Sequence, residues 1–260
     1  MAPSAITSAI GPNRPHTDAD ARTVQKLLKS VASFYGDPRL DPGPIDGKPG
    51  TGTFSAIERF QRMFMHRPDA VVDPGGRTIR RLLAQTAIAD AAKNCRFPYD
   101  HIPNWDYHTG MRAFGSRRSG GKRAHAGVDL YAAKGTPIHA MADETVTRAE
   151  YYFYNSTFAV EVDHGAFLAR YGEIKKGSCT LQKGDSVTVG QKIAEVGHLT
   201  GLTLPSDMLH FEIYDKTERG KLTRARGTSA IHTNRKPFLR RKDLMDATPL
   251  LDACRGRLAR

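Results

Sequence analysis

The stretch that decides the fold is SDMLHFEIYD, residues 206–215. Apolar residues occupy every second position from Leu209 onward, which is the period of a β-strand with one face in a core. The positions between them carry Met208, His210 and Glu212, so a histidine and a glutamate share the other face. An isolated histidine on a strand is more often a surface or hydrogen-bonded core residue than a metal ligand. The rest of the chain has to decide between these interpretations.

Length and composition are those of a globular protein with one large or two modest domains. The chain has 260 residues, of which 39% are hydrophobic and 25% charged. No apolar run approaches the roughly 18 residues that a membrane-spanning helix needs, which argues against an integral membrane segment. The first residues lack the basic start and apolar stretch of a secretory signal. We therefore expect synthesis in the cytoplasm without a signal peptide.

The charge balance is strongly basic, with 39 Lys and Arg against 27 Asp and Glu, a formal charge of +12. Such a balance suits an anionic polymer such as nucleic acid, bacterial cell wall or an acidic membrane surface, although a basic protein can also lack such a partner. No nucleic-acid-binding signature accompanies the charge, so we expect no nucleic acid partner. The densest basic stretch, residues 235–242, suits either contact with an anionic wall or plain solvation.

The three cysteines are Cys95, Cys179 and Cys254, far apart in the sequence. The absence of a C-x-x-C pair argues against a zinc site made of cysteines, and the odd number argues against a disulfide framework. One pair can still form if the protein reaches an oxidising compartment.

The chain divides into a helical part and a β-rich part. Residues 18–92 show apolar residues at helical spacing in three short segments, and Thr17 or Asp18, Thr53 and Thr78 are the expected starts or caps. From residue 97 onward, short β-branched or alternating runs are separated by glycine turns, which predicts an antiparallel all-β domain. We expect a disordered N-terminus over residues 1–17, a helical domain over 18–92, a β domain over 97–250 and a C-terminal tail over 251–260.

The helical part carries a family resemblance. The spacing of Asp46, Gly47, Gly50 and Thr53, followed by Phe60-Gln61 and by DPGGRT at residues 73–78, is similar to the peptidoglycan-binding-domain-1 family of three-helix modules. Most of these matches concern loops and core, so they indicate the fold better than a sugar or peptide contact. The resemblance implies cell-wall binding. The alternative is a helical adaptor that binds nothing.

A second motif, HAGVD, places His125 and Asp129 four residues apart. In an extended chain such residues point to the same face and can grip one cation together. Zinc accepts imidazole nitrogen and carboxylate oxygen, and a catalytic zinc needs three protein ligands and an open position. The natural third candidate is His210. On its own, however, the His-x-x-x-Asp spacing arises by chance in many proteins.

The order of motifs around this pair gives it context. HAGVDL at residues 125–130, GTPI at 135–138, VDHG at 162–165, KGD at 183–185 and LHFE at 209–212 together resemble the LytM/lysostaphin family of zinc endopeptidases. The resemblance covers roughly residues 111–214. It implies an antiparallel β domain with a zinc cleft that cleaves peptide crosslinks of bacterial peptidoglycan. By the family motif, one Zn²⁺ is held by His125, Asp129 and His210.

Two positions depart from the family pattern. The family has a histidine two residues before the last ligand, where this chain has Met208, and another in a Tyr-x-His-Leu segment, where this chain has Glu173. Methionine cannot transfer a proton, whereas a glutamate beside zinc can act as general base. One hypothesis is an active endopeptidase with Glu173 as base and acid. The other is a degenerate, metal-retaining protein that binds cell wall or activates an amidase. Glu173 can also be a plain surface residue.

Two further residues are candidates for substrate binding. The resemblance places Arg117 near the site, where it can orient a substrate carboxylate or form a salt bridge. Tyr171 shares a face with Glu173 in an extended segment and can donate a hydrogen bond to an oxyanion, or pack in the core. We interpret His164, in the VDHG turn, as structural.

A wall-binding module joined to a wall-cutting module fits two biological settings. One is an effector delivered to a rival's periplasm by a secretion apparatus, with an immunity protein and secretion-system components as partners. The other is a phage lysin released through a holin. In both settings the partner is peptidoglycan and the site of action is the periplasm or cell wall. Neighbouring genes would separate the two.

Overall fold

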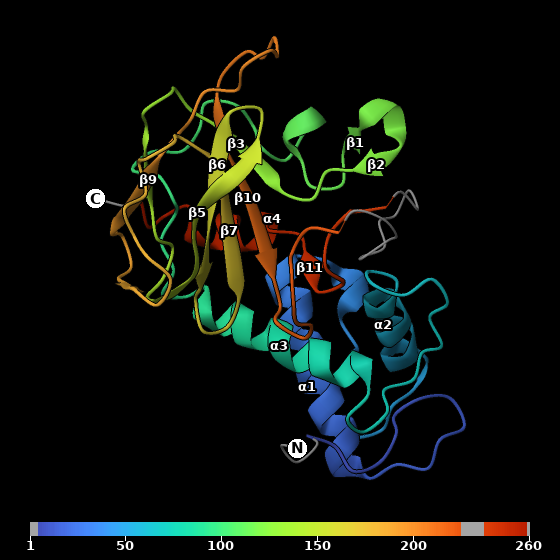
Figure 1. Ribbon diagram of the computed structural model, residues 1–260. Coiled ribbons are helices and arrows are strands. Elements are labelled where there is room, and N and C mark those ends of the chain that lie inside the picture. Colours follow the sequence, from blue (N-terminus) through green and yellow to red (C-terminus); the bar gives the residue numbers. More distant parts are fainter. Residues whose placement is uncertain (1–4, 225–236, 259–260) are drawn as a thin grey trace.

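The computed structural model describes residues 5–224 and 237–258, so Arg235 and Lys236 of the basic stretch lie outside it, as do residues 1–4 and 259–260. A group of helices precedes a mostly antiparallel β part, as the sequence predicted (Figure 1). The helices are α1 (Asp18–Tyr35), α2 (Thr51–Gln61), α3 (Arg77–Ala91) and the C-terminal α4 (Thr248–Cys254), with short 3₁₀ turns η1 (Pro38–Leu40), η2 (Gly110–Arg112) and η3 (Ser119–Gly121).

Only the first of the three expected helix caps is correct. The Thr17 hydroxyl accepts a hydrogen bond from the Asp20 amide at 3.2 Å and caps α1. By contrast, α2 and α3 begin after glycines, with no side-chain cap. The hydroxyls of Thr53 and Thr78 are buried inside the bundle, where they contact the Pro42 carbonyl at 3.4 Å and the Gln61 side-chain amide at 3.2 Å. These threonines tie loops and helices together, which is why they lie one position or more inside their helices.

The segment before α1 is not the disordered region expected over residues 1–17. Within its described part, residues 5–17, Ile6 and Ile10 are buried in the core of the helical domain. Ile10 also pairs with Val72 through two backbone hydrogen bonds of 3.0 and 2.8 Å. These two isoleucines belong to the core of the small bundle, and their burial holds the segment in place.

The β part is built on a seven-stranded antiparallel sheet in the order β11-β10-β7-β6-β5-β8, with β3 also paired to β10. Two small two-stranded sheets, β1–β2 and β4–β9, accompany it. The strands are β1 (Arg117–Arg118), β2 (Arg123–Ala124), β3 (Val128–Tyr131), β4 (Pro137–His139), β5 (Glu144–Tyr154), β6 (Thr157–Asp163), β7 (Leu168–Ile174), β8 (Ser186–Val187), β9 (Lys192–Glu195), β10 (Met208–Tyr214) and β11 (Leu244–Met245).

Strand β10 lies between β7 on one side and β3 on the other, and all of it is buried. Its Leu209, Phe211 and Ile213 belong to the main hydrophobic core, as the alternation predicted. The opposite face carries His210, which stands across from Asp129 of β3 and from Gly172 of β7. The strand therefore separates an apolar core from a polar layer.

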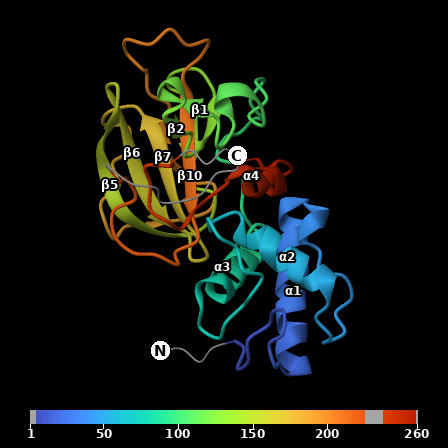
Figure 2. The same ribbon diagram turned by 90° about the vertical axis from the view of Figure 1, so that its right-hand side faces the viewer.

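The helical and β parts are packed directly against each other. Arg81 of α3 is buried and forms an ion pair with buried Asp215, with 2.8 Å between Nε and Oδ2. Its guanidinium also donates to the Lys242 carbonyl at 2.9 Å. In Figure 2, α4 lies between the sheet and α1. Leu251 and Cys254 of α4 are buried in the sheet's core, so the expected tail from residue 251 begins inside a packed helix.

Across the part of the chain that the structure covers, no helix combines the length and apolar character that a membrane span requires.

Candidate metal centre

Two adjacent strands bring Asp129 and His210 together. They are register partners on β3 and β10, and directly opposite residues have Cβ atoms roughly 4.5–5.5 Å apart. His125 precedes β3 and is held by two backbone hydrogen bonds of 2.8 Å, which pair it with Gly115 and Ser116. A short ribbon ahead of the sheet therefore positions the third residue.

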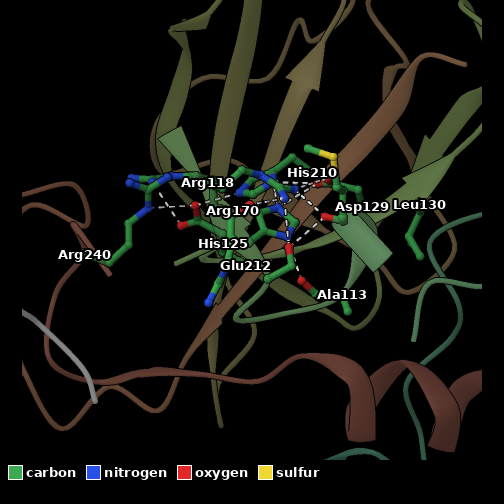
Figure 3. A network of polar contacts seen from close by, with 12 residues as sticks. Ala113, Arg118, His125, Asp129, Leu130, Arg170, His210, Glu212 and Arg240 are labelled. Carbon is green, nitrogen blue, oxygen red and sulfur yellow. Dashed lines mark hydrogen bonds and ion pairs between the residues drawn. The ribbon is translucent and has the colours of Figure 1, made fainter. Parts of the chain in front are cut away.

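The three side chains converge on one point inside the protein (Figure 3). Asp129 Oδ1 lies 3.0 Å from His125 Nε2 and 2.8 Å from His210 Nδ1, and the two nitrogens are 3.1 Å apart. All three residues are buried. The structure thus brings together the three residues that the sequence singled out as one set.

Every outward-facing polar atom of this trio has its own partner. His125 Nδ1 lies 3.0 Å from the Ala113 carbonyl and His210 Nε2 lies 2.9 Å from Glu212 Oε1. Since both partners are acceptors, each of these outward nitrogens carries a hydrogen, so in the neutral rings the inward nitrogens have the lone pairs. Asp129 Oδ2 accepts from Arg118 at 2.9 Å. The inward atoms are therefore three electron-pair donors.

This donor set fits zinc. Two imidazole nitrogens and one carboxylate oxygen are ligands of catalytic zinc sites, which leave a fourth position open. With bonds of about 2.0–2.1 Å, a tetrahedral ion separates its ligand atoms by about 3.3 Å, close to the three distances observed. Outward hydrogen bonds from ligand histidines to carbonyl and carboxylate groups are typical of metal sites.

The ionisation of the trio is set by its members' contacts. Burial lowers the pKa of His125 and would raise that of Asp129, but the charges and hydrogen bonds of the two histidines hold the pKa of Asp129 well below its usual range. Burial also opposes a charge on His210, but its bonds to Asp129 and Glu212 raise its pKa to about 9. The carboxylates of Asp129 and Glu212 therefore stabilise a positive charge on or beside the His210 ring.

Behind His210, a buried row of charges crosses three strands. Glu161 of β6, Arg170 of β7 and Glu212 of β10 are register partners. Arg170 binds Glu212 Oε2 at 3.0 Å and Glu161 Oε1 at 3.1 Å, and Arg240 binds Glu212 Oε1 at 2.8 Å. Despite full burial, the two arginines and His210 keep the pKa of Glu212 well below its usual value. Glu212 therefore stays ionised and holds the His210 ring.

Gly127, inside the HAGVD motif, is required by close packing. A Cβ atom at this position would lie 2.7 Å from His210 Cε1 and 2.7 Å from the Phe211 carbonyl. Any larger residue would push the His210 ring away from Asp129. The glycine between the two predicted ligands thus makes room for the third.

Glu173 occupies an unusual backbone position. Gly172 and Ile174 pair with the adjacent residues Ala159 and Phe158 of β6, so Glu173 is the extra residue of a β-bulge. Its φ of 64° lies in the left-handed region. Its carboxyl group is buried, and Oε2 has no hydrogen-bond partner within residues 5–224 and 237–258. Burial and the negative charge of Asp129 raise its pKa to about 8.

The structure places Met208 and Tyr171 in apolar surroundings. Met208 packs in a small cluster with Tyr131 and Leu199. The Tyr171 ring is in the main core, where its hydroxyl accepts from the Met141 amide at 3.0 Å and lies 2.9 Å from His164 Nε2. Regular alternation along β7 would have put Tyr171 and Glu173 on the same face. The bulge at Glu173 breaks that alternation. The Tyr171 hydroxyl therefore serves the core.

The arginine at the site is Arg118, the neighbour of the residue singled out in the sequence. Arg117 is exposed on β1, whereas Arg118 reaches Asp129. Sequence reasoning also missed Arg170, Glu161 and Arg240 around Glu212. Alternation along residues 168–174 could have placed Arg170 on the polar face of its own strand. Only the pairing of β6, β7 and β10 shows that it contacts Glu161 and Glu212. The resemblance pointed to Arg117, and no other signal in the sequence favoured Arg118.

Comparison with known proteins bears on both parts of the chain. Residues 123–221 match the model of peptidase family M23, and residues 17–79 match that of a putative peptidoglycan binding domain. Both resemblances noted in the sequence are thereby confirmed. No curated protein gives a significant match.

Several solved structures are similar to this chain. LytU is 23% identical, with a TM-score of 0.39, over 57% of this chain and 89% of that chain. Lysostaphin from Staphylococcus simulans is 16% identical, with a TM-score of 0.39, over 60% of this chain and 50% of that one. A zinc-containing peptidase from Vibrio cholerae is 23% identical, with a TM-score of 0.35, over 46% of this chain and 37% of that one.

Proposed function

Because the chain combines a peptidase family M23 domain with a putative peptidoglycan binding domain, we propose that it is a zinc-dependent endopeptidase that hydrolyses peptide crosslinks in bacterial peptidoglycan. The observation that carries this proposal is the convergence of His125 Nε2, Asp129 Oδ1 and His210 Nδ1 on one buried point. All outward atoms of these side chains are already hydrogen-bonded, so the inward ones are free to bind a cation.

In this proposal the three residues hold one zinc ion. Zinc supplies Lewis-acid chemistry, which polarises a peptide carbonyl and makes a water molecule more acidic. Arg118 and Glu212 act on the ligands, since the first fixes the Asp129 carboxylate and the second fixes the tautomer of His210. Phe153, whose ring centroid lies 5.6 Å from that of His210, shields this histidine on one side.

Glu173 is the proposed general base. Its buried carboxyl group feels the charges of Asp129, His210 and Arg118, and β-bulges often re-aim side chains next to active sites. A pKa of about 8 suits a group that takes a proton from water and returns it to the departing amine near neutral pH. Met208 cannot take this part, because a thioether does not transfer protons.

One observation favours a second candidate function. Met208 is packed among apolar residues, at a position where the resemblance would put a catalytic histidine. A domain that keeps its metal ligands but lacks effective proton transfer would bind cell wall or activate an amidase without cutting. The two candidates differ in whether Glu173 moves protons.

The helical domain is proposed to hold the protein on peptidoglycan, so that binding and cutting take place on the same polymer. The place of action is then the periplasm or the cell wall, reached through a secretion apparatus or after phage lysis. An immunity protein or a secretion-system component would be a partner only in the first setting.

The decisive experiment compares the zinc-loaded native chain with Glu173→Gln on purified peptidoglycan, measuring new amines and the muropeptides by mass spectrometry. The glutamine variant should keep one zinc per chain but cut about 10²–10⁴-fold more slowly. Glu58→Gln, the same change on the exposed surface of α2, is the matched control and should cut at the native rate. If the zinc-loaded native protein releases no amines, the non-cutting candidate replaces the peptidase. If Glu173→Gln cuts equally well, Glu173 is not the base.

A further inference from the structure

Two cysteines far from the metal centre lie in one buried place. Cys95 follows α3, in the segment that leads from the helical domain into the β part, and Cys254 is the last residue of α4. Both are fully buried and belong to the main hydrophobic core. The third cysteine, Cys179, lies elsewhere, after β7, where its amide donates to Glu150. The fold thus separates one cysteine from the other two.

The backbone around the two residues is held side by side. The segment after α4 runs parallel to the segment after α3, with Phe97 and Leu258 as bridge partners and the Phe97 amide 2.8 Å from the Arg257 carbonyl. Arg257 links both cysteines, since its Nε donates to the Cys95 carbonyl at 2.8 Å and its Nη2 lies 4.0 Å from Cys254 Sγ. These contacts hold the two segments together close to both cysteines.

Both thiols are free and lie close enough to affect each other's ionisation. Their interaction lowers the pKa of Cys95 and raises that of Cys254, so Cys95 is the better thiolate of the pair. Two buried thiols on neighbouring segments, which backbone and arginine hydrogen bonds already hold together, are placed for a disulfide bond.

We propose that Cys95 and Cys254 form a disulfide bond when the protein folds in or enters an oxidising compartment. The Cys95 thiolate attacks one sulfur of an oxidant's disulfide, which forms a mixed disulfide and releases one thiolate. The Cys254 thiolate then attacks the Cys95 sulfur and releases the second. Both cysteines are oxidised, the oxidant's disulfide is reduced to two thiols, and the two departing thiolates take up the protons that the cysteines lose.

The bond closes a ring around nearly the whole β part, from the start of its first segment to its last helix. It fastens α4, which lies between the sheet and α1, to the segment that leaves the helical domain. Closing a long loop restricts the unfolded chain strongly, so the oxidised protein should be markedly more stable. This inference is independent of the peptidase activity.

The test is refolding of the full chain from denaturant with either oxidised glutathione or excess reductant. Denaturing alkylation should then find one free thiol after oxidation and three after reduction, and digestion should yield a peptide joining Cys95 to Cys254. We expect the melting temperature of the oxidised form to be higher by roughly 5–15 °C. Cys179→Ser should keep this difference, and Cys254→Ala should lose it.

Three alkylated thiols after oxidative refolding, or a crosslink through Cys179, would overturn the proposal. So would a redox-dependent melting temperature in folded Cys254→Ala. If that variant does not fold, the crosslink map of the native chain still decides, since it needs no substitution.

Discussion

The two faces of the sheet around β10 hold two buried histidines of opposite character. His210 lies on the polar face and His164 lies on the apolar face, against Tyr171. Burial opposes a charge on both. Yet contacts with Asp129 and Glu212 raise the pKa of His210 to about 9, whereas burial lowers the pKa of His164 to about 4.

The difference comes from the partners. His164 Nδ1 faces the Asp143 carbonyl, so that nitrogen carries the hydrogen and Nε2 accepts from the Tyr171 hydroxyl. This arrangement satisfies a neutral ring completely. His210 has carboxylates on both nitrogens, so its site stabilises a positive charge. The charge of the neighbours, more than burial, decides whether a buried histidine can serve a cation.

The largest effect should follow from removing the charge on the polar face. Asp129→Asn keeps the shape of the side chain but removes a ligand and the negative charge that balances a cation. We expect the zinc content after dialysis to fall from one per chain to near zero, and peptidoglycan cleavage to fall by more than about 10³-fold. Metal analysis and amine release measure both. Asp90→Asn, the same change at an exposed position of α3, should leave them unaltered.

A smaller loss of zinc binding is expected from changing Glu212, which contacts the proposed ligand His210 but is not itself a proposed ligand. Glu212→Gln should weaken zinc binding about 10–100-fold, because the hold on the His210 ring becomes weaker. It should also lower the free energy of unfolding by about 3 kcal/mol, since Arg170 and Arg240 lose a buried partner. A competitive chelator titration and urea unfolding would measure the two effects.

Glu161→Gln is the matched control for that experiment. It makes the same change on the other side of Arg170, without touching His210. Stability should fall while zinc affinity stays within about twofold. Equal loss of zinc affinity in both variants would show that Glu212 acts only through the general stability of the sheet.

The smallest effect belongs to the apolar face and concerns pH. The folded pKa of His164, about 4, lies below the unfolded value of about 6.5, so the unfolded state binds the proton first. The contribution of His164 to stability is therefore complete above pH 6.5 and is lost as the pH falls toward 4. Between pH 7.5 and 4.5 this amounts to about 2–3 kcal/mol.

Urea unfolding of the native chain and of His164→Gln at the two pH values measures the pH-dependent contribution of His164 to the free energy of unfolding. The stability difference between them should shrink by that amount at the lower pH, because glutamine does not titrate. A difference that does not change with pH would mean that His164 is charged or solvated in the folded protein.

The sequence predicted the parts of the site that depend on local period. Alternation along residues 206–215 gave the two faces of β10, and the spacing of His125 and Asp129 gave two residues of the trio. Ordered motifs supplied the link to His210. The alternation is informative because strand geometry repeats every two residues and is little altered by the rest of the fold. His125 lies before β3 and is placed instead by its backbone hydrogen bonds with Gly115 and Ser116.

The remaining parts depend on features that a sequence does not display. The contacts of Arg170 with Glu161 and Glu212 follow from the pairing of three strands, which local patterns leave open. Thr53 and Thr78 have the chemistry of helix caps but form tertiary hydrogen bonds instead. In each case, contacts between distant segments outweighed a local preference.

The bulge in β7 sets stability against activity at a single residue. A glutamate with φ of 64° is strained by about 1 kcal/mol, and its buried carboxyl oxygen finds no partner in the described chain, which adds a further cost. Glycine at position 173 would remove both costs. Selection for thermostability alone should therefore discard Glu173, and any variant gained that way would be a sturdier protein without its proposed base.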